Sequence, residues 1–235
     1  MALIKTEAIV LKTINYRDKS KIVTLYTQSH GKMKAIAKGV RDVKTRWGGV
    51  LQPMAYLNTH IYYKENRGLQ LISGAEYVAA FRDIYDNADK MNIGFRLIEL
   101  LDKTTAENHE INGLFELLSS TLNYLNDATK NFVNLLFNFE FRLAKLLGFG
   151  INLDIQNSKN RQIKDSVGAV IIYEKDIDFL KNITGDSLEE ITEHILTKSS
   201  EASIDSFFDS YFKAHFDNLN FSNTKKVIFS REMRL

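Results

Sequence analysis

Three lysines lie close together on one short stretch of the chain: Lys32, Lys34 and Lys38. If this stretch is a β-strand, its side chains alternate between two faces, so the three lysines share one face while Met33 and Ala35 share the other. A line of cations can follow the phosphates of a nucleic acid, which contribute most of the sequence-independent binding free energy. A lysine-rich face is otherwise a solvated surface or a guarded sheet edge.

The charge of the surrounding region favours the first interpretation. Residues 1–74 hold 13 Lys and Arg residues against four Asp and Glu residues, a net charge of +9, whereas the remaining 161 residues carry −7. The +2 of the whole chain conceals this difference. Because a solvated face normally mixes both signs, the asymmetry predicts a polyanionic partner for the N-terminal part.

Further cations and aromatic residues follow the lysines. A loop bounded by Gly39 and Gly49 carries three more cations and Trp47, which is suited either to stacking on a base or to anchoring the loop. Between Tyr56 and Lys64, aromatic and basic residues share one face, as in proteins that bind single strands without sequence specificity, although such tyrosines equally serve packing. The predicted nucleic-acid-binding residues are Arg17, Lys19, Lys32, Lys34, Lys38, Arg41, Lys44, Arg46, Tyr62, Lys64 and Arg67.

Short strands separated by turns must position these residues. Stretches rich in β-branched and apolar residues cover residues 3–14, 21–28, 32–40, 56–64 and 69–72. Glycine-containing connections at residues 29–31 and 65–68 are suited to turns. Several short strands without a long helix predict a small β-barrel of the OB type over residues 1–76.

Helical periodicity follows. Residues 75–85 are alanine-rich and compatible with a helix, and leucine-rich stripes cover residues 93–101, 114–125 and 132–147, the last ending at Gly148. Residues 152–166 are polar, residues 167–173 suit one strand, and residues 179–183, 188–196 and 204–216 look helical. The predicted fold class is α+β: an N-terminal OB-fold β-barrel over residues 1–76, followed by a mainly α-helical domain over residues 77–235.

No pattern of catalytic or metal-binding residues stands out. The chain has no phosphate-binding glycine loop, and its five histidines are scattered. Glu189, Glu190, Glu193 and His194 could be imagined as metal ligands, but a solvated acidic helix face is favoured. We therefore expect no enzyme activity and no cofactor. With no cysteine, no apolar run of about 20 residues and no signal-peptide core, a cytoplasmic protein is expected.

Several segments resemble the RecO family of bacterial recombination mediators. The similarity begins at residues 6–11 (TEAIVL) and 22–27 (IVTLYT) and is clearest in the A-K-G-V-R segment at residues 37–41, followed by G-V-L-Q-P at residues 49–53. A second match lies at residues 139–143 (FEFRL), leading to L-G-F at residues 147–149. These matches cover the first 150 residues, and the similarity is loose beyond them.

The resemblance implies an OB fold, a helical domain and a nucleoid-associated role in recombinational repair. Members of the family bind single- and double-stranded DNA, anneal complementary strands, engage the acidic C-terminal tail of single-stranded-DNA-binding protein and, with RecR, help to load RecA. The resemblance places the tail-binding residues at Phe139, Arg142 and Phe149, where the two phenylalanines could instead be core. Many relatives carry four cysteines in a zinc module after the L-G-F segment, but this chain has none, so that site is excluded and residues 151–175 must be held by packing alone.

Two other functions stay open beside an annealing mediator. In one, the helical part dominates by capturing the acidic tail of a partner, and contact with DNA is incidental. In the other, the barrel is a general RNA-binding module or interaction adaptor. Charge reversal at the three lysines would distinguish the annealing mediator from the first alternative, because loss of annealing with partner binding intact favours the mediator. Affinity for RNA equal to or higher than that for DNA of the same sequence would favour the second alternative.

Overall fold

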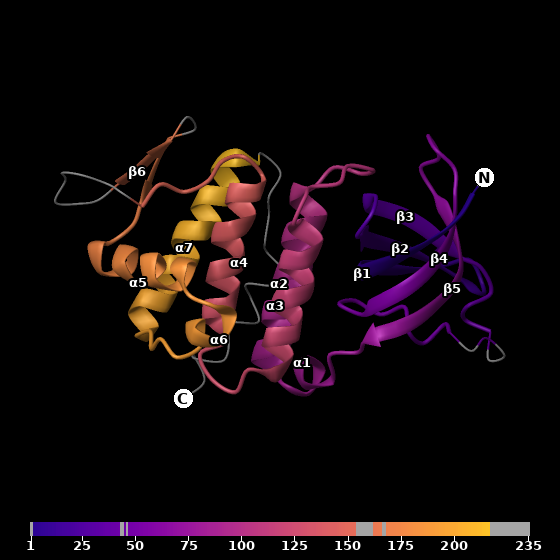
Figure 1. Ribbon diagram of the computed structural model, residues 1–235, viewed down its shortest axis with the longest axis horizontal. Helices are drawn as coiled ribbons and strands as arrows, with labels where there is room; N and C mark the ends of the chain where they lie inside the picture. Colours follow the sequence, from indigo (N-terminus) through magenta and orange to yellow (C-terminus); the bar gives the residue numbers. More distant parts are fainter. Residues whose placement is uncertain (1, 43–44, 46, 154–161, 166–167, 217–235) are drawn as a thin grey trace. The chain divides into compact units, whose positions relative to one another are not determined.

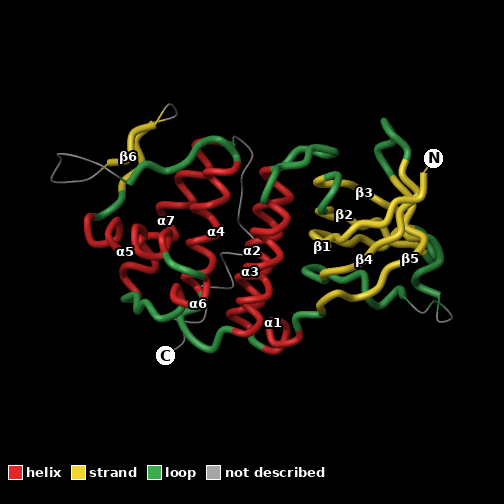
Figure 2. Tube along the Cα trace, viewed as in Figure 1, coloured by secondary structure: helices red, strands yellow, loops and turns green. Residues whose placement is uncertain are grey.

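The computed structural model describes residues 2–42, 45, 47–153, 162–165 and 168–216. Its N-terminal part is a closed five-stranded barrel with the strand order β1-β2-β3-β5-β4 (Figures 1 and 2). The strands are β1 (Ala2–Tyr16), β2 (Ser20–Thr27), β3 (Gly31–Ala37), β4 (Tyr56–Tyr63) and β5 (Gln70–Ala79). All neighbours are antiparallel except β3 and β5. A closed barrel of this size is the OB fold, and the predicted α+β class is confirmed.

Alternation of side chains along each strand fills the barrel. The inward residues include Val23 and Leu25 on β2, Met33 and Ala35 on β3 and Ile61 on β4, all of them buried. Met33 and Ala35, which were predicted to share one face of the lysine stretch, therefore both point into the barrel. Small residues on β3 suit the centre of a narrow barrel, because larger side chains from the facing strands fill the remaining space.

The strand β5 is longer than predicted. Residues 75–85 were expected to be helical, but β5 continues to Ala79, and the helix α1 covers only Arg82–Asp86. The extension pairs with β4 from Ala75, opposite Thr59, to Ala79, opposite Tyr56. Backbone pairing with a neighbouring strand thus overrides the weak helix preference of the alanines, which is a local property only.

The three leucine-rich stripes form the helices α2 (Ala88–Thr104), α3 (Leu114–Asp127) and α4 (Val133–Leu146), as predicted. Asn87 caps α2, because its side-chain oxygen accepts hydrogen bonds from the backbone N–H groups of Asp89 and Lys90. Gly148 follows α4 with φ of +90°, the left-handed conformation expected of a glycine that stops a helix.

The C-terminal part adds the two-stranded sheet β6 (Gln162–Asp165) and β7 (Gly168–Ile171), then α5 (Glu174–Gly185), α6 (Leu188–Ile191) and α7 (Lys198–His215). The predicted helix over residues 188–196 was wrong beyond Ile191. The side-chain amide of Asn134 donates to the carbonyls of Ile191 and His194, and that of Asn131 donates to Thr192. Side-chain amides of α4 and of Asn131 thus bind the carbonyls at the point where α6 ends. No helix in the described part of the chain is long and apolar enough to cross a membrane.

The chain divides into two compact units, residues 1–122 and 123–235. The first unit holds the barrel with α1, α2 and most of α3, because these helices and the segment between them pack on the barrel. In that packing, Tyr56 of β4 meets Phe115 of α3 edge to face, with 5.7 Å between the ring centres. The second unit contains the remaining helices, among which α4 contacts α5, α6 and α7 (Figure 1).

Candidate nucleic-acid interface

The predicted lysine face is not one open stripe. Lys32 is only 7% exposed, and its Nζ donates to the backbone carbonyl of Asp102 at 2.5 Å and lies 3.7 Å from the Asp102 carboxylate. Lys34 is half exposed, with its Nζ 2.5 Å from Glu107, and the hydrogen bond raises the pKa of Lys34. Lys38 lies exposed directly after β3. Two of the three lysines therefore already face acidic residues of this chain.

The segment that follows α2 covers the start of β3. The strand pairs with β5 only over Ala35–Ala37, which leaves the edge of its first residues to another partner. The backbone N–H of Asn108 fills that role by donating to the Lys32 carbonyl at 2.7 Å. At Gly31, where φ is +62°, a Cβ would lie 2.0 Å from the His109 carbonyl oxygen. This close approach requires glycine, and it fixes the covering segment against the barrel.

Two loops gather basic side chains at one end of the barrel. The backbone N–H of Arg41 donates to the carbonyl of Lys19 at 3.0 Å, and its guanidinium donates to the carbonyl of Arg17 at 3.1 Å. Asp42 lies 2.8 Å from Nζ of Lys19, and this hydrogen bond raises the pKa of Lys19. Lys38 follows Ala37, and the cross-strand partner of Ala37 on β2 is Lys21, two residues after Lys19. We call Arg17, Lys19, Lys38 and Arg41 the basic loop cluster.

The middle of the same long loop carries the two remaining predicted cations. Lys44 and Arg46 lie outside the described residues. Trp47 is partly buried and packs against the barrel core, so here it acts as an anchor of the loop.

The connection between β4 and β5 presents the other predicted residues. Lys64 and Arg67 are exposed, and Tyr62 lies on the outer face of β4, since its neighbour Ile61 points into the core. The buried side chain of Gln70 fixes the loop by donating to the carbonyls of Lys64 and Arg67 at 3.0 and 2.7 Å. Lys64 and Arg67 are thus presented by a loop that Gln70 holds in place, and Tyr62 lies on the strand that leads into it.

Two exposed lysines on β1, Lys5 and Lys12, were missed by the sequence interpretation. Their outward direction follows from strand alternation, with a register shift between Val10 and Lys12. Lys5 also lines an open cavity of about 350 Å³, but Glu7 and Glu76 line it too. This mixture of charges does not suit a phosphate site.

The residues predicted to bind a partner lie in the second unit. Phe139 is fully buried in α4 and belongs to the core. Arg142 is partly exposed on the same helix. Phe149 is partly exposed within an aromatic cluster, where it stacks on His215 with 4.2 Å between ring centres and its carbonyl accepts from the Tyr211 hydroxyl at 2.8 Å. The structure therefore leaves Arg142 and Phe149 accessible and Phe139 enclosed.

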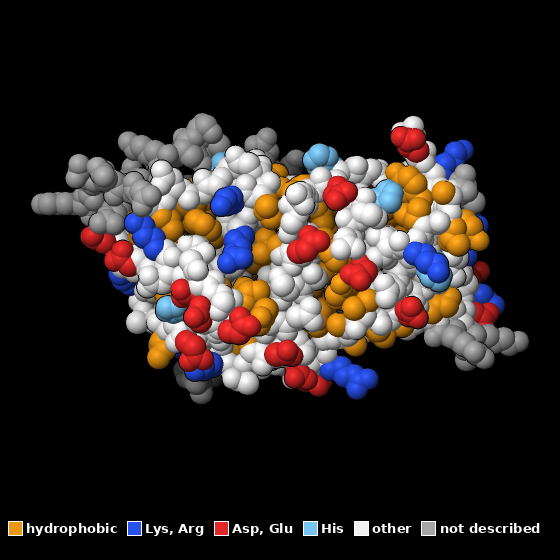
Figure 3. Space-filling view, viewed as in Figure 1, with side chains coloured by type: hydrophobic (Ala, Val, Ile, Leu, Met, Phe, Trp, Pro, Cys, Tyr) orange, Lys and Arg blue, Asp and Glu red, His pale blue; other side chains and the backbone are white. Residues whose placement is uncertain are grey.

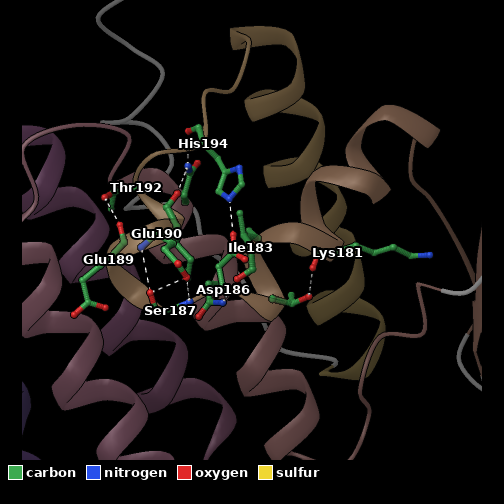
Figure 4. A network of polar contacts seen from close by, with 12 residues as sticks. Lys181, Ile183, Asp186, Ser187, Glu189, Glu190, Thr192 and His194 are labelled. Atoms are coloured by element: carbon green, nitrogen blue, oxygen red, sulfur yellow. Dashed lines mark hydrogen bonds and ion pairs between the residues drawn. The ribbon is translucent and has the colours of Figure 1, made fainter.

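The acidic stretch around α6 does not converge on one point (Figure 4). Each residue contacts a different neighbour: Glu189 accepts from the Tyr124 hydroxyl, Glu190 forms a capping box with Ser187, Glu193 pairs with Lys130 at 2.6 Å, and His194 Nε2 lies 2.5 Å from Asp186. Across the described residues, no group of three or more His, Cys, Asp or Glu side chains is arranged to hold a metal ion.

Comparison with known proteins identifies the family. The model "Recombination protein O N terminal" matches residues 1–81, and "Recombination protein O C terminal" matches residues 86–220. The DNA repair protein RecO of Chloroherpeton thalassium is 29% identical over 95% of this chain and 96% of its own length. The RecO of Salinibacter ruber is 35% identical over 65% of this chain and 59% of its own length, and that of Geobacter sulfurreducens is 34% identical over 64% and 61%.

The matches agree with the structure. The N-terminal model spans the closed barrel, and the C-terminal model spans the helices from α2 to α7. Together they cover most of the chain, including the A-K-G-V-R segment that contributes Lys38 and Arg41 to the basic loop cluster. The chain therefore belongs to the RecO family of DNA repair proteins.

Proposed function

We propose that this protein acts in DNA repair by binding single- and double-stranded DNA through its barrel and by annealing complementary strands. The observation that carries the proposal is the basic loop cluster. Hydrogen bonds from Arg41 to Arg17 and Lys19 hold the loops of β1–β2 and β3–β4 together, so cations from separate segments are presented side by side. Such preorganisation suits a phosphate backbone, because less side-chain entropy is lost on binding.

Annealing follows from the same charges. Two DNA strands repel each other through their phosphates, and bound cations reduce that repulsion while counterions are released. Asp42 lies beside the cluster and neutralises part of the charge of Lys19. Contact with backbone phosphates carries no sequence information, so we expect binding to depend little on sequence and strongly on salt. The proposed action needs no catalytic centre and no cofactor.

The proposed partners are RecR, RecA and single-stranded-DNA-binding protein. Family membership supports all three. For the acidic tail of single-stranded-DNA-binding protein, the candidates are the partly exposed Arg142, a cation, and the partly exposed Phe149, which belongs to an aromatic cluster. With RecR, the protein would help to load RecA on strands coated by single-stranded-DNA-binding protein.

A salt series on matched variants tests the proposal. Binding of a labelled single strand is measured for the wild type, for the double variant Lys38→Gln/Arg41→Gln and for Lys145→Gln, which removes an exposed lysine of α4. If both cations contact phosphates, the double variant lowers the slope of log K against log salt by about 1.4 for single strands and about 1.8 for duplex, whereas Lys145→Gln leaves it unchanged.

Annealing rates of complementary oligonucleotides are then measured at the same salt concentrations. We expect the double variant to anneal more slowly than both the wild type and Lys145→Gln. Equal slopes and equal annealing rates for all three proteins would contradict the proposal. A parallel series with RNA of the same sequence separates DNA repair from general RNA binding, since tighter binding of RNA favours the latter.

A further inference from the structure

Six apolar side chains form a row around the outside of the barrel, which we call the apolar row. Its members are Leu3 and Ile14 of β1, Ile22 of β2, Ile36 of β3, Leu71 of β5 and Tyr62 of β4. Each is the cross-strand partner of the next: Ile14 pairs with Ile22, Ile22 with Ile36, Ile36 with Leu71, Leu71 with Tyr62 and Tyr62 with Leu3. The row therefore crosses every strand of the barrel at neighbouring positions.

The row faces outward. Val23, Ala35 and Ile72 each lie one residue away from a member of the row and are buried in the barrel core, so the members point the other way. Leu3 and Ile14 are each 51% exposed, and the other four are partly exposed. Adjacent outward-facing apolar side chains of this kind are a candidate binding surface.

Cations border the row on both sides. The positions two residues away from its members hold Lys5, Lys12 and Lys34 on the outward face of the strands, and Lys38 and Lys64 directly after β3 and β4. Of these lysines, Lys34 already pairs with Glu107 of the covering segment. The remaining described residues at these positions are Tyr16, Ser20, Thr24, His60, Leu69 and Ser73, so none of them is acidic. Figure 3 shows hydrophobic side chains on the barrel surface near the N-terminus, with Lys and Arg and also Asp and Glu side chains around them. An apolar track between cationic borders suits a polyanion that has apolar parts.

We propose that the apolar row holds the bases of a single-stranded nucleic acid while the bordering lysines hold its phosphates. This inference rests on the proposed DNA binding and assigns the surface that distinguishes single strands from duplex. A duplex keeps its base faces stacked inside, so it meets the cations but gains little from the row. A second copy of the protein would bring lysines against lysines, which disfavours self-association through this face.

The dimensions fit a short strand. The central members Ile22, Ile36, Leu71 and Tyr62 lie on four neighbouring strands, which span about 14 Å across the sheet. The row therefore has room for only a few nucleotides, at the short end of the sites of about 4–16 nucleotides that OB folds cover. Tyr62 offers the aromatic ring for stacking, and the aliphatic members offer apolar contact.

The experiment replaces members of the row and keeps the charges. The double variant Ile36→Ser/Tyr62→Ser and the single variant Tyr62→Ala are compared with the wild type and with Val78→Ser, a control that removes an apolar side chain that is 44% exposed on β5, outside the row. Fluorescence anisotropy measures binding to a 20-nucleotide oligothymidylate, an abasic strand of equal length, a 20-base-pair duplex and oligouridylate. Thermal melting verifies that each variant is folded.

We expect both row variants to bind oligothymidylate at least about five-fold more weakly than the wild type, with an unchanged salt slope. Binding of the abasic strand and of duplex should stay within two-fold of wild type, as should all binding by Val78→Ser. Oligouridylate should lose affinity to the same extent as oligothymidylate, because the row contacts base faces and not the sugar.

Wild-type affinity of folded row variants for oligothymidylate would overturn the inference, and so would an equal loss on the abasic strand. Loss of binding to anionic vesicles, with binding of strands intact, would assign the row to membranes and overturn it too. A wild type that binds none of the strands refutes the proposed function itself. If the variant Lys38→Gln/Arg41→Gln binds weakly while the row variants bind normally, only the inference about the row fails.

Discussion

Replacement of Lys32 by methionine separates a structural lysine from a binding one. Lys32→Met keeps the apolar stem and removes the ammonium group, which is buried and donates to the Asp102 carbonyl at 2.5 Å. A hydrogen bond from a charged group contributes about 1.5–3 kcal/mol to the free energy of unfolding. The Asp102 side chain is one-third exposed, so water can solvate its carboxylate after the change. We therefore expect a loss near the lower end of this range.

Urea denaturation followed by tryptophan fluorescence measures this loss of unfolding free energy in the barrel. The single tryptophan, Trp47, packs against the barrel core, so its emission reports unfolding of the barrel. Lys34→Met is the matched control on the same strand, because its pair with Glu107 is solvent-exposed and such pairs contribute about 0.2–1 kcal/mol. If Lys32→Met unfolds like the wild type but binds DNA with a reduced salt slope, Lys32 is a phosphate ligand and the assignment of its role is wrong.

Three further outcomes are expected. Asn134→Ala should lower the free energy of unfolding by about 1–3 kcal/mol in calorimetry of the whole chain, because its amide donates to two carbonyls of the α6 turn; an unchanged melting temperature would contradict this role. Gly31→Ala should destabilise the barrel in urea, since its φ is +62° and a Cβ would meet the His109 carbonyl; stability equal to wild type would show that the covering segment is not held there. Burial raises the pKa of Tyr26 to about 12, so the contribution of its neutral form is complete below pH 10 and is lost as the pH rises through 12. Tyr26→Phe should therefore weaken the alkaline decrease in stability between pH 10 and 12, and an identical pH profile would refute that assignment.

The fold was predictable because it depends on local alternation and periodicity. The inward residues of the β3 stretch and the stripes of α2, α3 and α4 follow directly from spacing two and spacing 3.6. The end of β5 was not predictable, since residues 75–79 prefer a helix locally and become a strand only through pairing with β4.

The site was predictable only in part, for a similar reason. Strand alternation puts Lys32 on the outer face, but its burial depends on Asp102 and on the segment around Asn108, about 70 residues downstream. The apolar row is likewise invisible in the sequence, because its members come from five strands and meet only through the register of the barrel. The charge count did predict that the binding surface lies within residues 1–74, and the basic loop cluster lies there.

Binding of a single strand across a salt series, with the wild type and Lys38→Gln/Arg41→Gln side by side, shows whether the basic loop cluster contacts phosphates. We expect log K to fall linearly with log salt and the double variant to lower the slope by about 1.4. A slope that is the same for both proteins would contradict this expectation, because the basic loop cluster would then not contact phosphates.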